Sequence, residues 1–264
     1  MLGAIAGDII GSRFERSPIK TKDFPLFTAQ NHFTDDTVLT VAVAEAILTA
    51  DSYQHTLHRY GNRYPHAGYG ASFRAWLTQH DPHPYGSWGN GSAMRVAPVG
   101  HAFDNEEEVL AEAEKSACVT HDHPEGIRGA QAIAWAVFAA RTGGDKPFIR
   151  EEITARFGYD LGSTLADISP GYRFDVSCAG SVPQAIISFL EADDWQDAVR
   201  NAVSLGGDSD TLACMAGAVA EAFWGGIPAA VYAQMRRYLP TDFQKTIEAF
   251  YARFTLPVHS RGDG

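Results

Sequence analysis

The chain has 264 residues, 45% of them hydrophobic, which is enough for a globular protein with a sizeable core. Its 32 acidic and 21 basic side chains leave a formal net charge of −11. This charge disfavours broad binding to nucleic acid or to anionic membranes.

Sequence signals for export or membrane insertion are missing. The N-terminus has no basic region and Asp8 interrupts its apolar run, so we expect no signal peptide. The longest apolar stretches are too short to span a membrane. The three widely spaced cysteines, Cys118, Cys178 and Cys214, match no metal-binding spacing and indicate buried free thiols. We therefore expect a cytoplasmic protein, most simply a monomer.

The first segment predicts a helix over residues 3–12 in which Gly3, Gly7 and Gly11 recur every four residues. Residues four apart share one side of a helix, so that side carries no side chains. Glycine costs a helix about 1 kcal/mol relative to alanine, and close packing against a second helix is the expected compensation. Glu15 follows in a loop, where it is either a solvated acid or a mobile carboxylate near a metal site.

The cluster Thr34-Asp35-Asp36-Thr37 opens an apolar stretch that predicts a helix over residues 38–50. Threonine and aspartate are common helix caps. Adjacent carboxylates, however, repel each other and gain little as a pair of caps, and a bound divalent cation would relieve that repulsion. The cluster is either an ordinary helix start or part of a metal site.

Gly89-Asn90-Gly91-Ser92 ends a long polar and aromatic loop, at the expected start of another helix. Backbone N–H groups at such a junction can bind an anion such as phosphate. A turn rich in glycine and asparagine is the alternative interpretation.

His121-Asp122-His123 precedes an alanine-rich helix expected over residues 127–141. Two histidines separated by one residue can bind a transition metal, but no further cluster of histidine or cysteine completes such a site. The alternative is that a histidine at this helix start binds a phosphate or hydroxyl group of a substrate.

The second acidic cluster, Gly206-Gly207-Asp208-Ser209-Asp210-Thr211, also opens an apolar helix. Two glycines before a capping residue are typical of a junction between a loop and a helix. Two carboxylates and two hydroxyls in four residues exceed what a cap requires, and oxygen ligands of this kind suit Mg²⁺. We expect the two acidic clusters to converge as two helix N-termini around one or two cations.

Helices separated by Gly/Pro loops recur through the chain, and no segment shows convincing strand alternation. Residues 143–179 are the least informative. The sequence predicts an all-α fold, a compact single-domain bundle over residues 1–264 with a frayed tail at 257–264. The further helices that we expect cover residues 53–60, 71–77, 105–118, 149–157, 180–190 (with Pro183 near its first turn), a segment beginning near Asp194, 229–238 and 241–253.

Five of these segments together resemble the ADP-ribosylglycohydrolase family, which includes the glycohydrolase that reactivates dinitrogenase reductase and the mammalian ADP-ribosylhydrolases. They follow one another in the family's order. The segments are Gly3–Glu15, Thr34–Thr37, Gly89–Arg95, Thr120-His121 and Gly206–Thr211.

The resemblance implies a binuclear Mg²⁺ centre, with Mn²⁺ as an alternative, in a compact all-α fold. It implies that Glu15 lies on a mobile segment over the metals and is one of the catalytic residues, with Asp35, Asp36 and Asp210. The implied metal ligands are Thr34, Asp35, Asp36, Asp208, Asp210 and Thr211. The implied substrate-binding residues are Asn90, Gly91, Ser92, Met94 and His121.

The implied activity is hydrolysis of the N- or O-glycosidic bond between ADP-ribose and an acceptor. Asp35, Asp36 or Asp210 could take a proton from the attacking water. The acceptor remains open among arginine, serine, a nucleic-acid terminus and a small metabolite. The alternatives are a metal-dependent hydrolase of another ADP-ribose-containing metabolite or phosphoester, a non-catalytic ADP-ribose-binding relative, and coincidental helix caps.

Overall fold

The computed structural model describes residues 1–254, so the predicted frayed tail lies outside the described residues. Within this range the fold is all-α, as predicted, and the only β-pairing is an isolated bridge between Gly89 and Ser177. The α-helices are α1 (Leu2–Gly11), α2 (Asp35–Thr49), α3 (Tyr53–Arg63), α4 (Ala71–Leu77), α5 (Gly91–Met94), α6 (Ala97–Ala102), α7 (Glu106–Cys118), α8 (Pro124–Arg141), α9 (Lys146–Phe157), α10 (Leu165–Ile168), α11 (Cys178–Leu190), α12 (Trp195–Ser204), α13 (Ser209–Trp224), α14 (Ala229–Met235) and α15 (Thr241–Arg253).

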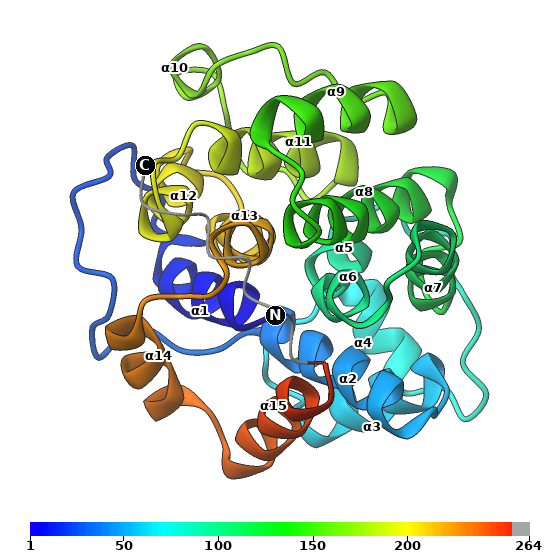
Figure 1. Cartoon of the computed structure of the whole chain (residues 1–264). Coiled ribbons are helices and arrows are strands. Elements are labelled where there is room, and N and C mark those ends of the chain that lie inside the picture. Colours follow the sequence, from blue (N-terminus) through cyan, green and yellow to red (C-terminus); the bar gives the residue numbers. More distant parts are fainter. Residues whose placement is uncertain (255–264) are drawn as a thin grey trace.

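Helix α13 is the centre of the fold. It packs against α1, α8, α11 and α12, which surround it in Figure 1. Nearly all of its residues are buried, because it is apolar on every side. The second acidic cluster therefore stands at the start of an almost entirely buried helix.

The glycine repeat of α1 is the contact surface for α13, so the predicted close approach of a second helix is confirmed. A Cβ atom at Gly3, Gly7 or Gly11 would collide with the backbone of α13. Gly217 on α13 faces Gly3 in the same way. This packing fixes Asp8 of α1 beside the start of α13, because the two backbones cannot separate without opening a void.

Several helix boundaries differ from the prediction for local reasons. Helix α2 begins three residues early because Thr34 caps it, with its side chain accepting the N–H of Asp36. Helix α8 begins at Pro124, which suits the first position of a helix because proline has no N–H to leave unpaired. Helix α11 begins at Cys178, so Pro183 lies inside the helix and not near its first turn.

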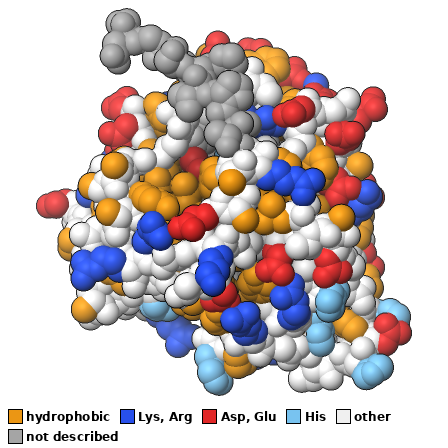
Figure 2. Space-filling view, turned by 60° about the horizontal axis from the view of Figure 1, so that its bottom comes forward, with side chains coloured by type: hydrophobic (Ala, Val, Ile, Leu, Met, Phe, Trp, Pro, Cys, Tyr) orange, Lys and Arg blue, Asp and Glu red, His pale blue; other side chains and the backbone are white. Residues whose placement is uncertain are grey.

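The predicted helix over 229–238 divides into α14 and a 3₁₀ turn, Arg236–Tyr238. The three thiols are free, but only Cys178 and Cys214 are buried, and Cys118 is partly exposed, contrary to the expectation. No helix in residues 1–254 combines the length and hydropathy needed to cross a membrane. Acidic and basic side chains are interspersed on the face in Figure 2, so this face offers no continuous basic surface.

Candidate active site

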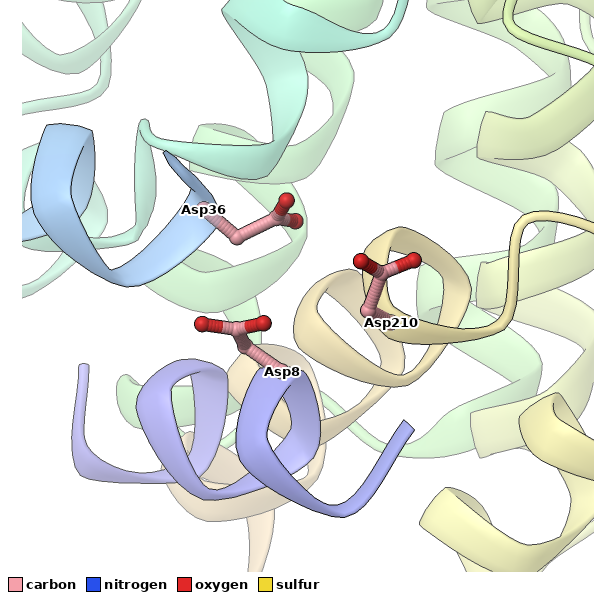
Figure 3. A group of neighbouring side chains, drawn as sticks. All are labelled: Asp8, Asp36 and Asp210. Atoms are coloured by element: carbon pink, nitrogen blue, oxygen red, sulfur yellow. The ribbon is translucent and has the colours of Figure 1, made fainter. Parts of the chain in front are cut away.

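Three carboxylates that are far apart in the sequence converge at one place (Figure 3). Asp8 lies within α1, Asp36 in the first turn of α2 and Asp210 in the first turn of α13. Each has an oxygen within 4.8 Å of an oxygen of both others. The two acidic clusters thus lie together at helix N-termini, in an arrangement of hard oxygen atoms that suits a divalent cation.

Both oxygens of the Asp8 carboxylate accept hydrogen bonds from the first cluster. Its Oδ2 accepts the backbone N–H groups of Thr34 at 3.0 Å and Thr37 at 3.1 Å, and also the Thr37 hydroxyl. Its Oδ1 accepts the Thr34 hydroxyl at 2.7 Å. Asp8 therefore holds the N-terminus of α2 in place from another helix, and its Oδ1, which accepts one hydrogen bond, keeps a lone pair.

Asp36 and Asp210, unlike Asp8, each have a carboxylate oxygen that accepts no hydrogen bond among the described residues. Their side chains are 2% and 4% exposed, and the Oδ1 atom of each is buried without a hydrogen-bond partner among residues 1–254. Asp36 Oδ2 lies 3.2 Å from the Thr34 hydroxyl and 3.3 Å from the Thr211 hydroxyl. Because the Thr34 proton already serves the shorter contact with Asp8, Asp36 is poorly satisfied by the protein. Orphaned buried carboxylate oxygens of this kind are what a cation would coordinate.

The other two acids of the clusters flank this group. Asp208 is 6% exposed and accepts the side-chain amide of Asn90 at 2.8 Å. Asp35 is partly exposed and lies beside Gly68, since a Cβ atom at position 68 would be 3.2 Å from its Oδ1. Of the acids in the two clusters, only Asp35 is more than slightly exposed.

The five carboxylates of this site repel one another when ionised. They are Asp8, Asp35, Asp36, Asp208 and Asp210. Burial raises the pKa of Asp35 to about 8, and the charges of Asp8, Asp208 and Glu15 add to the increase. Burial also raises the pKa of Asp208 to about 6, against the hydrogen bond from Asn90. The pKa values of the remaining three acids are raised too, first by burial.

Among the described residues, no basic side chain forms an ion pair with any of these five acids. The protein thus leaves a concentrated negative charge uncompensated. Glu15, which directly follows the 3₁₀ turn after α1, adds to this field, because its charge raises the pKa values of Asp35, Asp208 and Asp210. One or more divalent cations fit this donor set by charge and by ligand chemistry.

The Gly-Asn-Gly loop lies against the second cluster. Asn90 links the two through its bond to Asp208, and its own N–H donates to the Val176 carbonyl at 2.7 Å. The Ser92 hydroxyl donates to the Gly126 carbonyl of α8 at 2.7 Å, so it is already used within the fold. Met94 is buried, and its carbonyl accepts the thiol of Cys214. Of the predicted substrate residues in this loop, Asn90 has the side chain nearest to the acids.

His121 also lies at this loop. It is 4% exposed, and a Cβ atom at Gly91 would lie 3.2 Å from its Nε2. His123 instead caps α8, accepting the N–H of Glu125 at 3.1 Å. The group of potential metal ligands found within residues 1–254 contains neither histidine. Of the predicted histidine pair, His123 is thus used as a helix cap, and His121 lies beside the Gly-Asn-Gly loop.

Asp8 is the residue of this site that sequence reasoning did not assign. Its one signal was an acidic residue inside an otherwise apolar helix, directly after Gly7. A carboxylate in a helix that packs tightly on both sides must be buried, and a buried carboxylate needs hydrogen-bond donors. That argument would have selected Asp8, although not its partners.

Comparison with known proteins places this arrangement in context. A family profile described as ADP-ribosylglycohydrolase matches residues 1–259, nearly the whole chain. The chain belongs to the ADP-ribosylglycohydrolase family. The resemblance predicted from the motifs is thus confirmed, and so is the prediction that the chain is an enzyme of the hydrolase class that acts on ADP-ribose glycosidic bonds.

Relatives of this ADP-ribosylglycohydrolase domain align over most of their length. The chain is similar to ADP-ribosylhydrolase ARH3 of Gallus gallus, at 26% identity over 95% of this chain and 88% of the relative. ADP-ribosylhydrolase ARH3 of Homo sapiens is 27% identical over 85% of this chain and 84% of that protein. ADP-ribosylarginine hydrolase Tri1 of Pseudomonas putida is 23% identical over 86% of this chain and 71% of that protein.

A solved structure supports the same assignment. A chain of an ADP-ribosylglycohydrolase-related protein complex superposes with a TM-score of 0.70 and 25% identity, over 96% of both chains. The all-α arrangement described above is therefore the fold of this family.

Proposed function

We propose that this chain is a divalent-cation-dependent hydrolase that releases ADP-ribose from a modified acceptor and so reverses ADP-ribosylation. The observation that carries the proposal is the pair of orphaned, buried oxygens on Asp36 and Asp210 inside an uncompensated acidic cluster. Such a cluster is unfavourable unless a cation occupies it. The names of the relatives, which are hydrolases of ADP-ribosyl groups, support the substrate class.

The residues proposed to hold two Mg²⁺ ions, or Mn²⁺ in their place, belong to the two acidic clusters. Asp8 is proposed to orient the first cluster through Thr34 and Thr37. When bound, the cations would supply positive charge that orients ribose hydroxyl groups and makes a nearby water more acidic. The proposed ligands are Thr34, Asp35, Asp36, Asp208, Asp210 and Thr211.

Cleavage at the anomeric carbon passes through an oxocarbenium-like transition state, and the attacking water must lose a proton. Asp35, Asp36 and Asp210 are candidates for accepting that proton. We favour Asp35, because it is the most exposed of the three and so can exchange protons with solvent. Glu15, at the rim of the cluster, is proposed to help hold the sugar end of the substrate.

The loop beside the cluster is proposed to bind the ADP-ribose. Asn90, Gly91 and Met94 would contact it from the loop, and His121 from behind Gly91. Ser92 is proposed to contribute through its backbone only, because its hydroxyl is bound to Gly126. The acceptor is proposed to be a protein side chain or a small metabolite.

The test is the release of free ADP-ribose from three substrates: a serine-linked peptide, an arginine-linked peptide and O-acetyl-ADP-ribose. Each is incubated with Mg²⁺, with Mn²⁺ and with EDTA, using wild type, the Asp36→Asn/Asp210→Asn variant and the exposed control Asp104→Asn. Cation-dependent release that is lost only in the double variant supports the proposal and identifies the acceptor. Cleavage to AMP indicates a phosphoester hydrolase, and tight ADP-ribose binding without release indicates a non-catalytic binder.

A further inference from the structure

One lysine anchors the long connection between α1 and α2. Residues 15–34, which form this connection, contain no helix or strand. Within it, the ammonium group of Lys20 donates to three backbone carbonyls. They belong to Ser169 at 2.7 Å, Tyr172 at 3.1 Å and Leu205. A lysine ammonium has three protons, so these acceptors use all of them.

The three carbonyls come from two places that are distant in the sequence. Leu205 is the C-cap of α12, where the last carbonyls of a helix lack partners within the helix. A positive charge is favourable at that end of a helix. Ser169 and Tyr172 lie in the turn that follows α10. Lys20 thus joins the connection between α1 and α2 to both of these places.

The lysine meets the chain directly before the second acidic cluster. A Cβ atom at Gly206 would lie 2.8 Å from the Ile19 carbonyl oxygen and 3.2 Å from Cε of Lys20. A Cβ atom at Gly207 would collide with the ring of Tyr172. Close packing therefore leaves no room for a side chain at either of the two glycines that precede the cluster.

The same part of the chain contacts the start of α13 at a second point. Gly11, the last residue of α1, packs there, because a Cβ atom on it would collide with the Ser209 carbonyl oxygen. The chain that leaves Gly11 returns to the same region at Lys20. Glu15 lies between these two contacts and so stays near the cluster, which agrees with the effect of its charge in raising the pKa of Asp208.

Few other contacts hold this stretch. In the described chain, Lys20 is the only member of residues 15–21 whose side chain hydrogen-bonds to a distant part of the protein. Phe14, just before the stretch, is buried. Just after it, the Lys22 carbonyl accepts Nη1 of Arg200 at 2.6 Å. Loss of the Lys20 ammonium group would therefore release the stretch between two fixed ends.

We propose that Lys20 is a positioning residue that keeps Glu15 at the sugar end of the substrate. Its ammonium group fixes residues 15–21 to a turn between two packed helices, and this limits the positions that the Glu15 carboxylate can take. The role of Glu15 rests on the proposed function, whereas the anchoring by Lys20 does not. The cation ligands are not involved, because α12 and α13 also hold the Gly206-Gly207 turn.

The first test measures the anchoring without any substrate. A nitroxide attached to Ser17→Cys reports the motion of the segment by electron paramagnetic resonance, in a chain whose partly exposed Cys118 is replaced by serine. We expect a more mobile label in Lys20→Met, which keeps the length of the side chain but has no donor. Lys20→Arg keeps the charge and the donors and should retain the wild-type spectrum. The matched control is Lys22→Met, because Lys22 lies in the same connection but pairs with Asp197, and its spectrum should also be that of wild type.

Kinetics then distinguish the positioning of Glu15 from a general effect on the fold. For an ADP-ribosyl substrate that turns over, kcat/KM should fall about tenfold in Lys20→Met, recover in Lys20→Arg and stay unchanged in Lys22→Met. In a Glu15→Gln background, Lys20→Met should cause no further loss, because a residue that acts through the Glu15 carboxylate then has nothing to position. The affinity for Mn²⁺, measured by titration calorimetry without substrate, should remain that of wild type in Lys20→Met.

These measurements separate the possible failures. An unchanged label spectrum in Lys20→Met overturns the proposal. An equal loss of kcat/KM with and without the Glu15 carboxylate, or a weakened affinity for Mn²⁺, also overturns it, since either result means that Lys20 acts on the fold or on the cation ligands. A label that becomes mobile in Lys20→Met, in a chain that hydrolyses no ADP-ribosyl substrate, contradicts the proposed function and leaves the anchoring by Lys20 supported.

Discussion

The carboxylate of Asp8 accepts the backbone N–H of Thr37 at 3.1 Å, so a side chain from α1 caps the N-terminus of α2. The same carboxylate binds the N–H and hydroxyl of Thr34. Helix capping is normally local, through a residue just before the helix. Here the cap comes from a helix locked against α13, and it fixes the first acidic cluster relative to the second.

Replacing Asp8 with asparagine tests this role. Asparagine has one acceptor oxygen where the carboxylate has two, so some of the four donors of Thr34 and Thr37 lose their partner. We expect the affinity for Mn²⁺, measured by titration calorimetry, to fall about tenfold or more, as is typical when an outer-shell partner of a metal site is lost. Asp104→Asn, an exposed control, should bind Mn²⁺ as wild type does, and equal affinity in Asp8→Asn would contradict the orienting role.

The stability of the cation-free protein should depend on pH. In the unfolded chain an aspartate loses its proton near pH 3.8, whereas the folded pKa is about 6 for Asp208 and about 8 for Asp35. Between these values the folded state binds more protons than the unfolded state, so the free energy of unfolding falls as pH rises from about 4 to 8. Thermal unfolding in EDTA should show Tm decreasing over that range.

Mg²⁺ should reverse this loss, because it binds the ionised cluster of the folded protein. At a concentration one hundred times its dissociation constant, the expected stabilisation is about 2.7 kcal/mol, and it should be larger at pH 8 than at pH 5. A Tm in EDTA that is constant or rises across this range, or that Mg²⁺ leaves unchanged at pH 8, would be inconsistent with an uncompensated carboxylate cluster.

Replacing Asp36 and Asp210, whose Oδ1 atoms lack hydrogen-bond partners among the described residues, tests whether these acids serve activity or the stability of the fold. Asp36→Asn/Asp210→Asn should lower kcat/KM for an ADP-ribosyl substrate at least about a hundredfold, because the cations lose their central ligands. The same variant, in EDTA at pH 8, should unfold at a Tm no lower than wild type, since two mutually repelling charges are gone. A large loss of cation-free stability would show instead that the two acids stabilise the fold.

The packing of α1 on α13 gives a prediction independent of the site's chemistry. In Gly7→Ala the new methyl group would meet the backbone of α13 at Ala213, which cannot move aside as a flexible side chain can. We expect a loss of at least about 2 kcal/mol in urea unfolding. Gly70→Ala is the matched control, because nothing lies within 4 Å of a Cβ atom there, and its effect should stay below about 1 kcal/mol.

Features that depend only on residues close together in the sequence could be predicted from it. Thr34, Asp35 and Asp36 predict both a helix start and repulsion between adjacent carboxylates. In the structure α2 begins at Asp35, and the charge of Asp35 contributes to the raised pKa of Asp36. The glycine repeat of α1 predicted a close helix contact. It did not identify α13 as the partner, because a helix face without side chains contains no information about which helix packs against it. Repeated helix patterns and Gly/Pro stops were enough to predict the all-α class.

Long-range relationships were not predictable in the same way. The partners of Asp8 are 26 and 29 residues away, and nothing in its own segment points to them. Val176, in the segment that the sequence left unassigned, accepts the N–H of Asn90 and so positions the loop beside the acids. Such contacts form only when helices from distant parts of the chain pack together, so they cannot be predicted from a single sequence.

The central claim is most directly tested by mass spectrometry of the product after cation is added back to EDTA-treated protein. The substrate is an ADP-ribosyl compound that turns over in the panel described above. We predict that intact free ADP-ribose, with an unmodified acceptor, appears after Mg²⁺ or Mn²⁺ is restored and stays absent in Asp36→Asn/Asp210→Asn. Release that proceeds equally in EDTA, or a product cleaved at the diphosphate, would contradict the claim.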